Sequence, residues 1–427
     1  MSDNTSQVFP IVSDTACLLK WAWSTVFLSL GTTSSCHRCD HDQVPAGQFD
    51  TFHNTPRKLL SREIMRRGEW PQAGCQYCQQ IESAGGMSDR QFQLVMHKQE
   101  NRVPVELLSD PTANAVTPTV MEMYFTNTCN MACLYCGPHF SSLWQKENEK
   151  HGLFRQDGIN LSPHNKHAGD YDQRLQEFWQ WFEKNHLNIR FFHVLGGEPF
   201  YQDELIQLLD FFETHPNPQL QLVLVSNLKV GNKKFRSIID RMMDLKQRGH
   251  LLRIQITGSL DCWGPQQEFV RWGLDLQEWT ENFEYILSQD IIVNINGAIS
   301  SLTVKTMPEY IEKINYWNQL KKDLGFTGPA SYISYSFMTV TSPTNHMRPD
   351  IFGPGVFDED FQKILAAMPT DTDKQRHDKE HMAGIARQIA AAPRNDQAIT
   401  GLKTYLNEIS RRRGTDWKPL FPWLDQL

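Results

Sequence analysis

The sequence predicts an α/β protein with a parallel sheet at its centre. Between residues 116 and 340, strand-like and helix-like stretches alternate, which is typical of successive βα units. Six stretches rich in β-branched and apolar residues fit strands: Thr119–Phe125, Asn188–Leu195, Gln219–Ser226, Leu251–Thr257, Ile291–Ile299 and Tyr332–Met338. The stretches that fit helices are Gln173–Asn185, Asp203–Thr214, Lys233–Arg248, Leu276–Ser288 and Thr306–Leu324. Because the chain has 427 residues, we expect a further domain on each side of this segment.

Composition and charge exclude two classes of protein. The chain carries 42 basic and 49 acidic residues, so it lacks the positive surplus of a nucleic-acid-binding protein. We interpret the one dense basic run, Arg411 to Arg413, as a solvated helix end. No run of about eighteen apolar residues is present, so the sequence predicts no membrane span.

The nine cysteines indicate metal binding rather than disulfides. Their number is odd, and they are clustered along the chain. The apolar stretch from Cys17 to Leu30 is not a signal peptide, because acidic residues precede it and Lys20 interrupts it. We therefore expect a cytoplasmic protein with reduced thiols.

Residues 126–138 carry the clearest chemical signal. Cys129, Cys133 and Cys136 have the spacing C-x3-C-x2-C, with Tyr135 before the last cysteine. A predicted strand leads into this loop, and a predicted helix, Phe140 to Lys150, follows it. Three thiolates on one short loop can hold three irons of a cubane cluster and leave the fourth iron free to bind a small molecule. The alternative is a structural zinc loop with a distant fourth ligand, although zinc loops usually present C-x2-C or C-x4-C pairs.

This spacing, the aromatic residue and the strand–loop–helix setting resemble the signature of the radical S-adenosylmethionine (SAM) enzymes. The family implies a [4Fe–4S] cluster whose open iron binds SAM. It also implies reductive cleavage of SAM to a 5′-deoxyadenosyl radical, which removes hydrogen from a peptide or small-molecule substrate. The expected fold is a partial (β/α)6 TIM-like barrel with its site at the carboxyl ends of the strands. An electron donor such as flavodoxin or ferredoxin is expected as a partner.

Several motifs at later strand ends match SAM-binding positions of this family. Gly196-Gly197-Glu198-Pro199 follows the second predicted strand and resembles the GGE motif that binds the SAM amino group. Ser226-Asn227 follows the third strand, where the family binds ribose; a turn or helix cap is the alternative. Ser259 follows the fourth strand and resembles a serine that contacts the SAM carboxylate or ribose. Asp261 is either a further contact or a cap of the helix that begins near Pro265.

Three other polar residues are candidates for SAM contacts. Arg271 lies where related enzymes place a basic residue for the SAM carboxylate, and arginine suits that geometry; a solvated arginine is the alternative. Asn294 and Asn296 alternate along a predicted strand, where they read adenine or are ordinary half-buried sheet residues. Cys262 fits no ligand spacing and is expected to be a small hydrophobic residue.

The N-terminal segment, residues 1–115, carries a second group of cysteines. Trp21 to Leu30 fits a strand, and Gly31 to Ser35 fits a hairpin turn. The arrangement resembles the Twitch domain, the short form of the SPASM domain that accompanies radical SAM enzymes, although that domain more often follows the barrel. The resemblance implies that an auxiliary [4Fe–4S] cluster is held by Cys17, Cys36, Cys75 and Cys78.

Two cysteines distinguish this ligand set from its alternative. In the auxiliary-cluster hypothesis Cys17 is a ligand and Cys39 is not. A zinc knuckle pair would instead use the two C-x2-C units, Cys36 with Cys39 and Cys75 with Cys78. Residues 91–118 fit a linker to the central segment.

The last segment, residues 341–427, predicts a helical extension. Its boundary is marked by Thr341 to Thr344. Helices are expected over Phe357–Ala367, Asp373–Ala391 and Asp396–Arg412. An apolar tail follows, and we expect this segment to cover the open edge or the base of the barrel.

The sequence therefore predicts a radical SAM enzyme with domains at 1–115, 116–340 and 341–427. One alternative is the same enzyme with a structural zinc-knuckle domain at its N-terminus. Another is a non-catalytic iron–sulfur protein that binds a partner or senses redox state.

Overall fold

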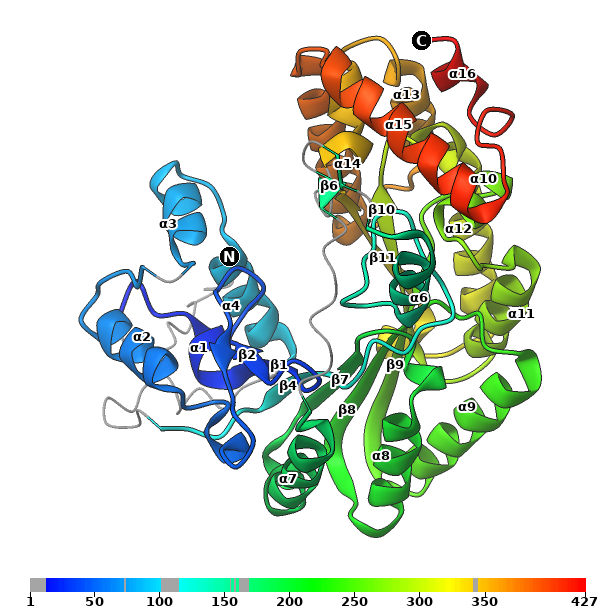
Figure 1. Cartoon of the computed structure of the whole chain (residues 1–427). Coiled ribbons are helices and arrows are strands. Elements are labelled where there is room, and N and C mark those ends of the chain that lie inside the picture. The colour runs from blue at the N-terminus through cyan, green and yellow to red at the C-terminus, as the bar shows by residue number, and fades with distance from the viewer. Residues whose placement is uncertain are drawn as a thin grey trace, which may run out of the picture.

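The computed structural model describes residues 13–72, 74–100, 115–153, 155–156, 159–160, 169–340 and 345–427. Within this described part, the protein is a mixed α/β structure built on a nine-stranded sheet (Figure 1). The strand order is β11-β10-β9-β8-β7-β4-β1-β2-β3, so β11 and β3 form the two edges and the sheet is open. The partial barrel, open at one side, that the family resemblance implies stays a prediction.

The six predicted strands of the central segment are confirmed, and they lie side by side in chain order. They are β4 (Val120–Tyr124), β7 (Phe191–Leu195), β8 (Asn217–Ser226), β9 (Leu251–Ser259), β10 (Ile292–Ile299) and β11 (Ile333–Thr339). Each pairs in parallel with its neighbours, so their carboxyl ends share one edge of the sheet. Polar groups that follow these strands are thereby brought together.

The predicted helices between these strands are also confirmed. They are α7 (Tyr171–Asn185), α8 (Asp203–Thr214), α9 (Asn232–Gln247), α11 (Leu276–Leu287) and α12 (Met307–Asp323), and Figure 1 shows them outside the row of strands. The short helix α10 (Pro265–Val270) precedes α11. Alternate residues of β10, from Val293 to Ile299, are buried, whereas Asn294 and Asn296 on its other face are not. One face of the sheet is therefore packed against helices and the other is more open.

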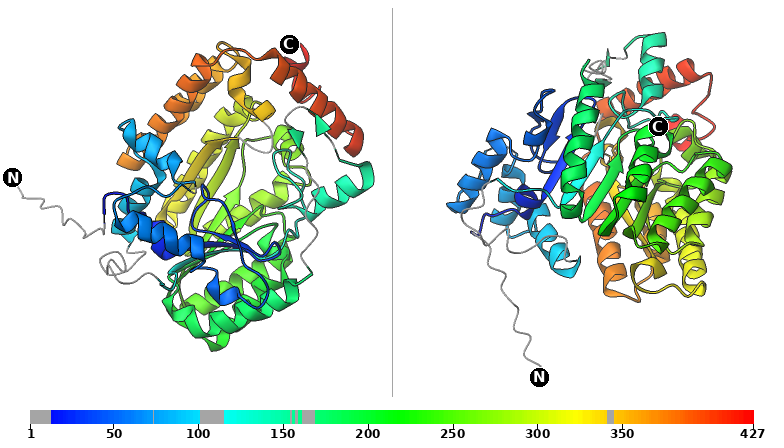
Figure 2. Two further views of the ribbon diagram at one scale, coloured as in Figure 1. Left: turned by 60° about the vertical axis from the view of Figure 1, so that its left-hand side comes forward. Right: turned by 90° about the horizontal axis from the view of Figure 1, so that it is seen from below.

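The N-terminal segment continues the same sheet. Its elements are α1 (Leu18–Ala22), β1 (Trp23–Phe27), β2 (Thr32–Ser34), β3 (Asp42–Gln43), α2 (Pro56–Arg66), α3 (Gln76–Ser83) and α4 (Asp89–Glu100). β1 pairs in parallel with β4 and antiparallel with β2, so the expected hairpin is present. Its turn is residues 28–31, and the prediction of a turn at Gly31 to Ser35 is wrong, because Thr32–Ser34 forms β2. Trp23 joins Val120 and Phe191 in one apolar cluster, so this segment packs against the more open face of the sheet (Figure 2).

The C-terminal helices agree with the sequence prediction. They are α13 (Asp358–Ala367), α14 (Asp373–Ala391), α15 (Asp396–Arg413) and the short α16 (Pro422–Asp425). Residues of these helices share one hydrophobic core with the sheet, from Val26 to Leu424. None of the helices in the described part of the chain is long and apolar enough to cross a membrane.

Two smaller elements lie between β4 and α7. They are α6 (Ser142–His151) and a two-stranded sheet of β5 (Arg155–Gln156) and β6 (Ile159–Asn160). Half of the predicted linker, residues 101–114, and the boundary at 341–344 lie outside the described residues. The linker prediction is wrong for residues 91–100, which belong to α4. The division into three domains stays a prediction. The sheet is continuous across the first proposed boundary, because β1 pairs with β4.

Candidate active site

A cavity of about 300 Å³ opens beside the cysteine loop at the carboxyl ends of β4, β7, β8 and β9. The residues that line it come from all the motifs that follow these strands: Tyr124, Cys129, Met131, Cys133, Tyr135, Cys136, Phe140, Leu195, Gly196, Gly197, Val225, Ser226, Asn227, Ser259 and Arg271. Three other predicted contacts, Glu198, Pro199 and Asp261, are buried around it. The parallel sheet thus brings together residues that are far apart in sequence.

The three cysteines of the loop are half-buried thiols. Burial raises the pKa of each, that of Cys136 to about 12, so the thiols carry protons at neutral pH when no metal is bound. Among the described residues, no group of three His, Cys, Asp or Glu side chains is arranged to hold a single metal ion. The choice between an iron–sulfur cluster and zinc at this loop stays a prediction.

The glycine turn after β7 is held directly against the cysteine loop. The backbone N–H of Gly197 donates to the carbonyl oxygen of Thr126 at 3.2 Å, and that of Glu198 donates to Thr128 at 2.7 Å. A Cβ atom on Gly197 would lie 2.0 Å from the Thr128 carbonyl oxygen. Gly196 has a φ of +112°, a conformation that side chains disfavour. Both glycines are needed because the two loops approach this closely.

Glu198 links the glycine turn to the end of β8. Its side chain is fully buried, and its carboxylate accepts hydrogen bonds from Ser226 Oγ at 2.7 Å and from the Asn227 backbone N–H at 2.6 Å. Burial raises the pKa of Glu198 to about 7, although these donors favour the charged form. The Asn227 side chain then reaches Oδ1 of Asn130 in the cysteine loop, at 2.9 Å. The three motifs therefore form one hydrogen-bonded unit.

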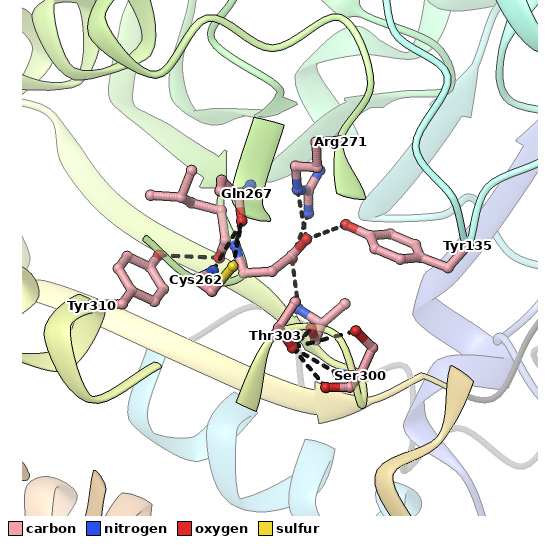
Figure 3. Close-up of polar contacts among 10 residues, drawn as sticks. Tyr135, Cys262, Gln267, Arg271, Ser300, Thr303 and Tyr310 are labelled. Atoms are coloured by element: carbon pink, nitrogen blue, oxygen red, sulfur yellow. Dashed lines mark hydrogen bonds and ion pairs between the residues drawn. The ribbon is translucent and has the colours of Figure 1, made fainter. Parts of the chain in front are cut away.

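Asp261 and Arg271 form a buried ion pair behind the cavity (Figure 3). Arg271 Nε lies 2.9 Å from Oδ2 of Asp261, and its Nη2 lies 2.8 Å from Oδ1. The hydroxyl of Tyr135 also donates to Asp261, and the Ala298 backbone N–H donates at 2.8 Å. Arg271 itself lines the cavity. Asp261 thus links Arg271 to Tyr135, the residue before Cys136.

This pair overturns two alternatives raised from the sequence. Arg271 is only 8% exposed, so the interpretation as a solvated arginine is wrong. The residue before α10 is Gly264, and the carboxylate of Asp261 faces Arg271, so the helix-cap interpretation is also wrong. Gln267 supports the segment, because its Oε1 accepts the backbone N–H groups of Asp261 and Cys262 (Figure 3). Cys262 is fully buried, as expected of a small hydrophobic residue.

The two asparagines of β10 are placed differently from the other candidates. Asn294 accepts a hydrogen bond from Ser334 on β11 at 2.6 Å, and Asn296 is exposed on the same face. Neither is among the described residues that line the cavity. Their contact with adenine stays a prediction.

The sequence analysis missed how α15 supports the cysteine loop. Tyr405 donates its hydroxyl proton to the carbonyl oxygen of Leu134 at 2.7 Å, and Arg413 Nη2 donates to that of Ala132 at 3.0 Å. Arg413 also pairs with Glu147 at 3.0 Å and lies over the ring of Trp144. The interpretation of residues 411–413 as a solvated helix end is therefore wrong for Arg412 and Arg413, whose side chains are 1% and 2% exposed.

The N-terminal cysteines gather near α1. Cys36 Sγ lies 3.3 Å from Cys39 Sγ, and Lys20 Nζ donates to Cys39 Sγ at 2.9 Å. Hydrogen bonds from Cys36 and Cys75 lower the pKa of Cys39. Burial lowers the pKa of Lys20, but the neighbouring thiolates outweigh it and raise that pKa above its ordinary value.

Cys39 lies among the other N-terminal cysteines, so its position does not separate the two ligand sets. Cys17 is buried, and Cys78 is near enough for its charge to act on Cys17. All the cysteines of both hypotheses therefore come from one region, and their assignment stays a prediction.

Comparisons with known proteins give no family assignment. No protein-family profile matches the chain, and no curated protein matches its sequence. Solved structures that match include three of SuiB from Streptococcus suis. Those described as bound to the precursor peptide SuiA and to S-adenosylmethionine are each 12% identical, with TM-scores of 0.35 and 0.36. This chain spans 62% of the length of each, and 75% of this chain is covered.

The third structure, of SuiB alone, is 11% identical with a TM-score of 0.37. It covers 90% of this chain, and 71% of SuiB is covered. The inference about function therefore rests on the geometry of the site itself.

Proposed function

We propose that the protein is a radical SAM enzyme whose cluster is held by Cys129, Cys133 and Cys136. One observation carries this proposal: a single cavity brings the cysteine loop together with the glycine turn, the end of β8, Ser259 and Arg271. When bound, the [4Fe–4S] cluster supplies the electron that cleaves SAM to a 5′-deoxyadenosyl radical. The substrate that loses hydrogen is a peptide or a small molecule.

The residues of the cavity have separate roles in this proposal. Backbone groups of Gly196 and Gly197, which approach the cysteine loop, face the amino group of SAM. Arg271 binds the carboxylate, since Asp261 occupies only part of its set of five N–H donors. Ser226, Asn227 and Ser259 present polar side chains to the ribose. Tyr124 and Phe140 line the cavity with apolar surface that excludes water.

We further propose that Cys17, Cys36, Cys75 and Cys78 hold an auxiliary [4Fe–4S] cluster in a Twitch-like N-terminal domain. Four thiolates complete the coordination of a cubane, so this cluster would exchange electrons and leave SAM to the other site. Flavodoxin or ferredoxin is the expected class of electron donor. The hypothesis with zinc on Cys36, Cys39, Cys75 and Cys78 is tested by the same experiments.

The decisive experiment is SAM cleavage under anaerobic conditions. The purified protein is reconstituted with iron and sulfide, given a reductant and SAM, and assayed for 5′-deoxyadenosine. The Cys133→Ala variant should give no product. Cys262→Ala is the matched control, because Cys262 is a buried cysteine outside every proposed ligand set. No product from the reconstituted parent protein would refute the enzyme and leave the non-catalytic iron–sulfur protein.

Metal analysis of the same samples tests the N-terminal site. Two clusters should give about eight irons per chain, whereas one cluster with a zinc knuckle should give about four irons and one zinc. Loss of iron in Cys17→Ala with no loss of metal in Cys39→Ala supports the auxiliary cluster. Loss of zinc in Cys39→Ala with no loss of metal in Cys17→Ala supports zinc knuckles.

A further inference from the structure

Lys20 is a buried lysine whose ammonium group contacts sulfur. It lies in α1, three residues after Cys17, and its side chain is only 4% exposed. Its Nζ donates to Sγ of Cys39 at 2.9 Å, and Cys39 lies 3.3 Å from Cys36. The helix therefore carries a positive charge directly into the group of N-terminal cysteines.

Burying an ammonium group is costly unless it is hydrogen-bonded, and a nearby negative charge offsets the cost further. The group in contact with Lys20 is Sγ of Cys39, and Cys75 and Cys36 are the next cysteines whose charge acts on it. Other buried basic residues of this segment have oxygen partners. Lys58 donates to Thr33 Oγ1 and the Phe52 carbonyl oxygen, each at 2.8 Å, and Arg90 pairs with Glu82. Lys20 is thus placed to neutralise charge on sulfur.

We propose that Lys20 is the counter-cation of the N-terminal metal–thiolate site and that it raises the reduction potential of the auxiliary cluster. This inference rests on the auxiliary cluster of the proposed function. Four thiolates give such a cluster a net negative charge, which grows by one when the cluster takes up an electron. A fixed positive charge in a site of low dielectric stabilises the reduced state more than the oxidised state. The proposed step adds one electron to the cluster and involves no proton transfer.

The consequence concerns the direction of electron flow. A cluster with a raised potential accepts an electron more readily from a substrate radical. That change favours a net oxidation of the substrate. In such a reaction the substrate loses a hydrogen atom to the deoxyadenosyl radical and then one electron to this cluster.

The test uses the full chain with Cys129, Cys133 and Cys136 replaced by Ala, so that only an N-terminal cluster remains. In this background, Lys20→Met removes the charge and keeps the length of the side chain, whereas Lys20→Arg keeps the charge. Arg67→Met removes one positive charge from the same segment at an exposed position and controls for net charge. Each protein is analysed for iron and zinc, and its midpoint potential is measured by a titration followed by electron paramagnetic resonance.

We expect unchanged iron and a more negative potential in Lys20→Met, with Lys20→Arg and Arg67→Met close to the background protein. An unchanged potential in Lys20→Met at equal iron content would overturn the proposal. If Lys20→Met loses iron, retention of iron by Lys20→Arg supports the counter-cation, and loss in both refutes it. A background protein that holds zinc or no iron refutes the auxiliary cluster itself, and metal analysis reports this before any potential is measured.

Discussion

Asp261 holds Arg271 by two hydrogen-bonded contacts of 2.8 and 2.9 Å in a site where neither side chain is more than 10% exposed. The pair lies between the cysteine loop and β10, because Asp261 also accepts from Tyr135 and from the backbone of Ala298. Two of the five N–H donors of Arg271 are used in this way. Arg271 is also among the residues that line the cavity.

The first prediction is that Asp261→Ala strongly destabilises the protein. It leaves the Arg271 charge buried and unpaired, which costs about 3–5 kcal/mol of unfolding free energy. Urea denaturation of the metal-free protein measures this loss. Glu63→Ala, which removes an exposed ion pair with Arg67, is the control and should be within error of the parent.

A double-mutant cycle separates the pair from its surroundings. The double variant Asp261→Leu with Arg271→Met should lose less stability than the sum of its single variants, because no unpaired charge stays buried. Arg271→Met alone should also weaken SAM binding if Arg271 binds the SAM carboxylate. Additive losses in the cycle would show that the ion pair is not coupled.

A second prediction concerns the contact between the glycine turn and the cysteine loop. Gly197→Ala places a Cβ atom 2.0 Å from a backbone oxygen, so one of the two loops must move. We expect a loss of about 1–3 kcal/mol in stability and reduced iron after reconstitution. Gly137→Ala is the matched control, since it follows Cys136 and has open space around its Cβ position. Equal iron content in the two variants would contradict this account.

The sequence predicted the strands, helices and motif positions of the central segment because these depend on local patterns. The alternation that defines β10 and the cysteine spacing of residues 129–136 are both visible within a few residues. Parallel order then places the carboxyl ends of successive strands together, so the gathering of Ser226, Ser259 and the cysteine loop could also be expected.

Side-chain contacts that depend on long-range packing could not be predicted in this way. The sequence gives no sign that Arg271 pairs with Asp261 or that Glu198 faces Ser226. Arg412 and Arg413 resemble any basic helix end, and their burial depends on α6 and the cysteine loop, more than 250 residues earlier. A buried arginine is identified by its neighbours in space, which the local sequence does not contain.

The third prediction is that Arg413 stabilises the cysteine loop and its neighbour Arg411 does not. Arg413→Met breaks the buried pair with Glu147 and the hydrogen bond to Ala132. We expect a loss of about 2–4 kcal/mol in unfolding free energy and slower iron uptake during reconstitution. Arg411→Met changes the net charge equally at a side chain that is 61% exposed, and it should behave as the parent. Equal losses in both variants would indicate an effect of net charge alone.

The last prediction concerns pH and Glu198. The ordinary pKa of a glutamate is about 4.5, and burial raises that of Glu198 to about 7 in the folded protein. The folded state therefore binds this proton more tightly than the unfolded state. The resulting stability is present below pH 4.5 and is lost as the pH rises through 7, by roughly 3 kcal/mol in total. Gln at this position does not titrate, so Glu198→Gln should lack this part of the pH dependence.

Urea denaturation of the metal-free protein at several pH values between 5 and 8 measures this difference. The parent should lose about 3 kcal/mol more than Glu198→Gln over this range. Contributions from other titrating groups, such as the N-terminal cysteines, are shared by both proteins and cancel in the comparison. Parallel pH profiles would show that the hydrogen bonds from Ser226 and Asn227 offset the burial of the carboxylate, because those donors favour its charged form.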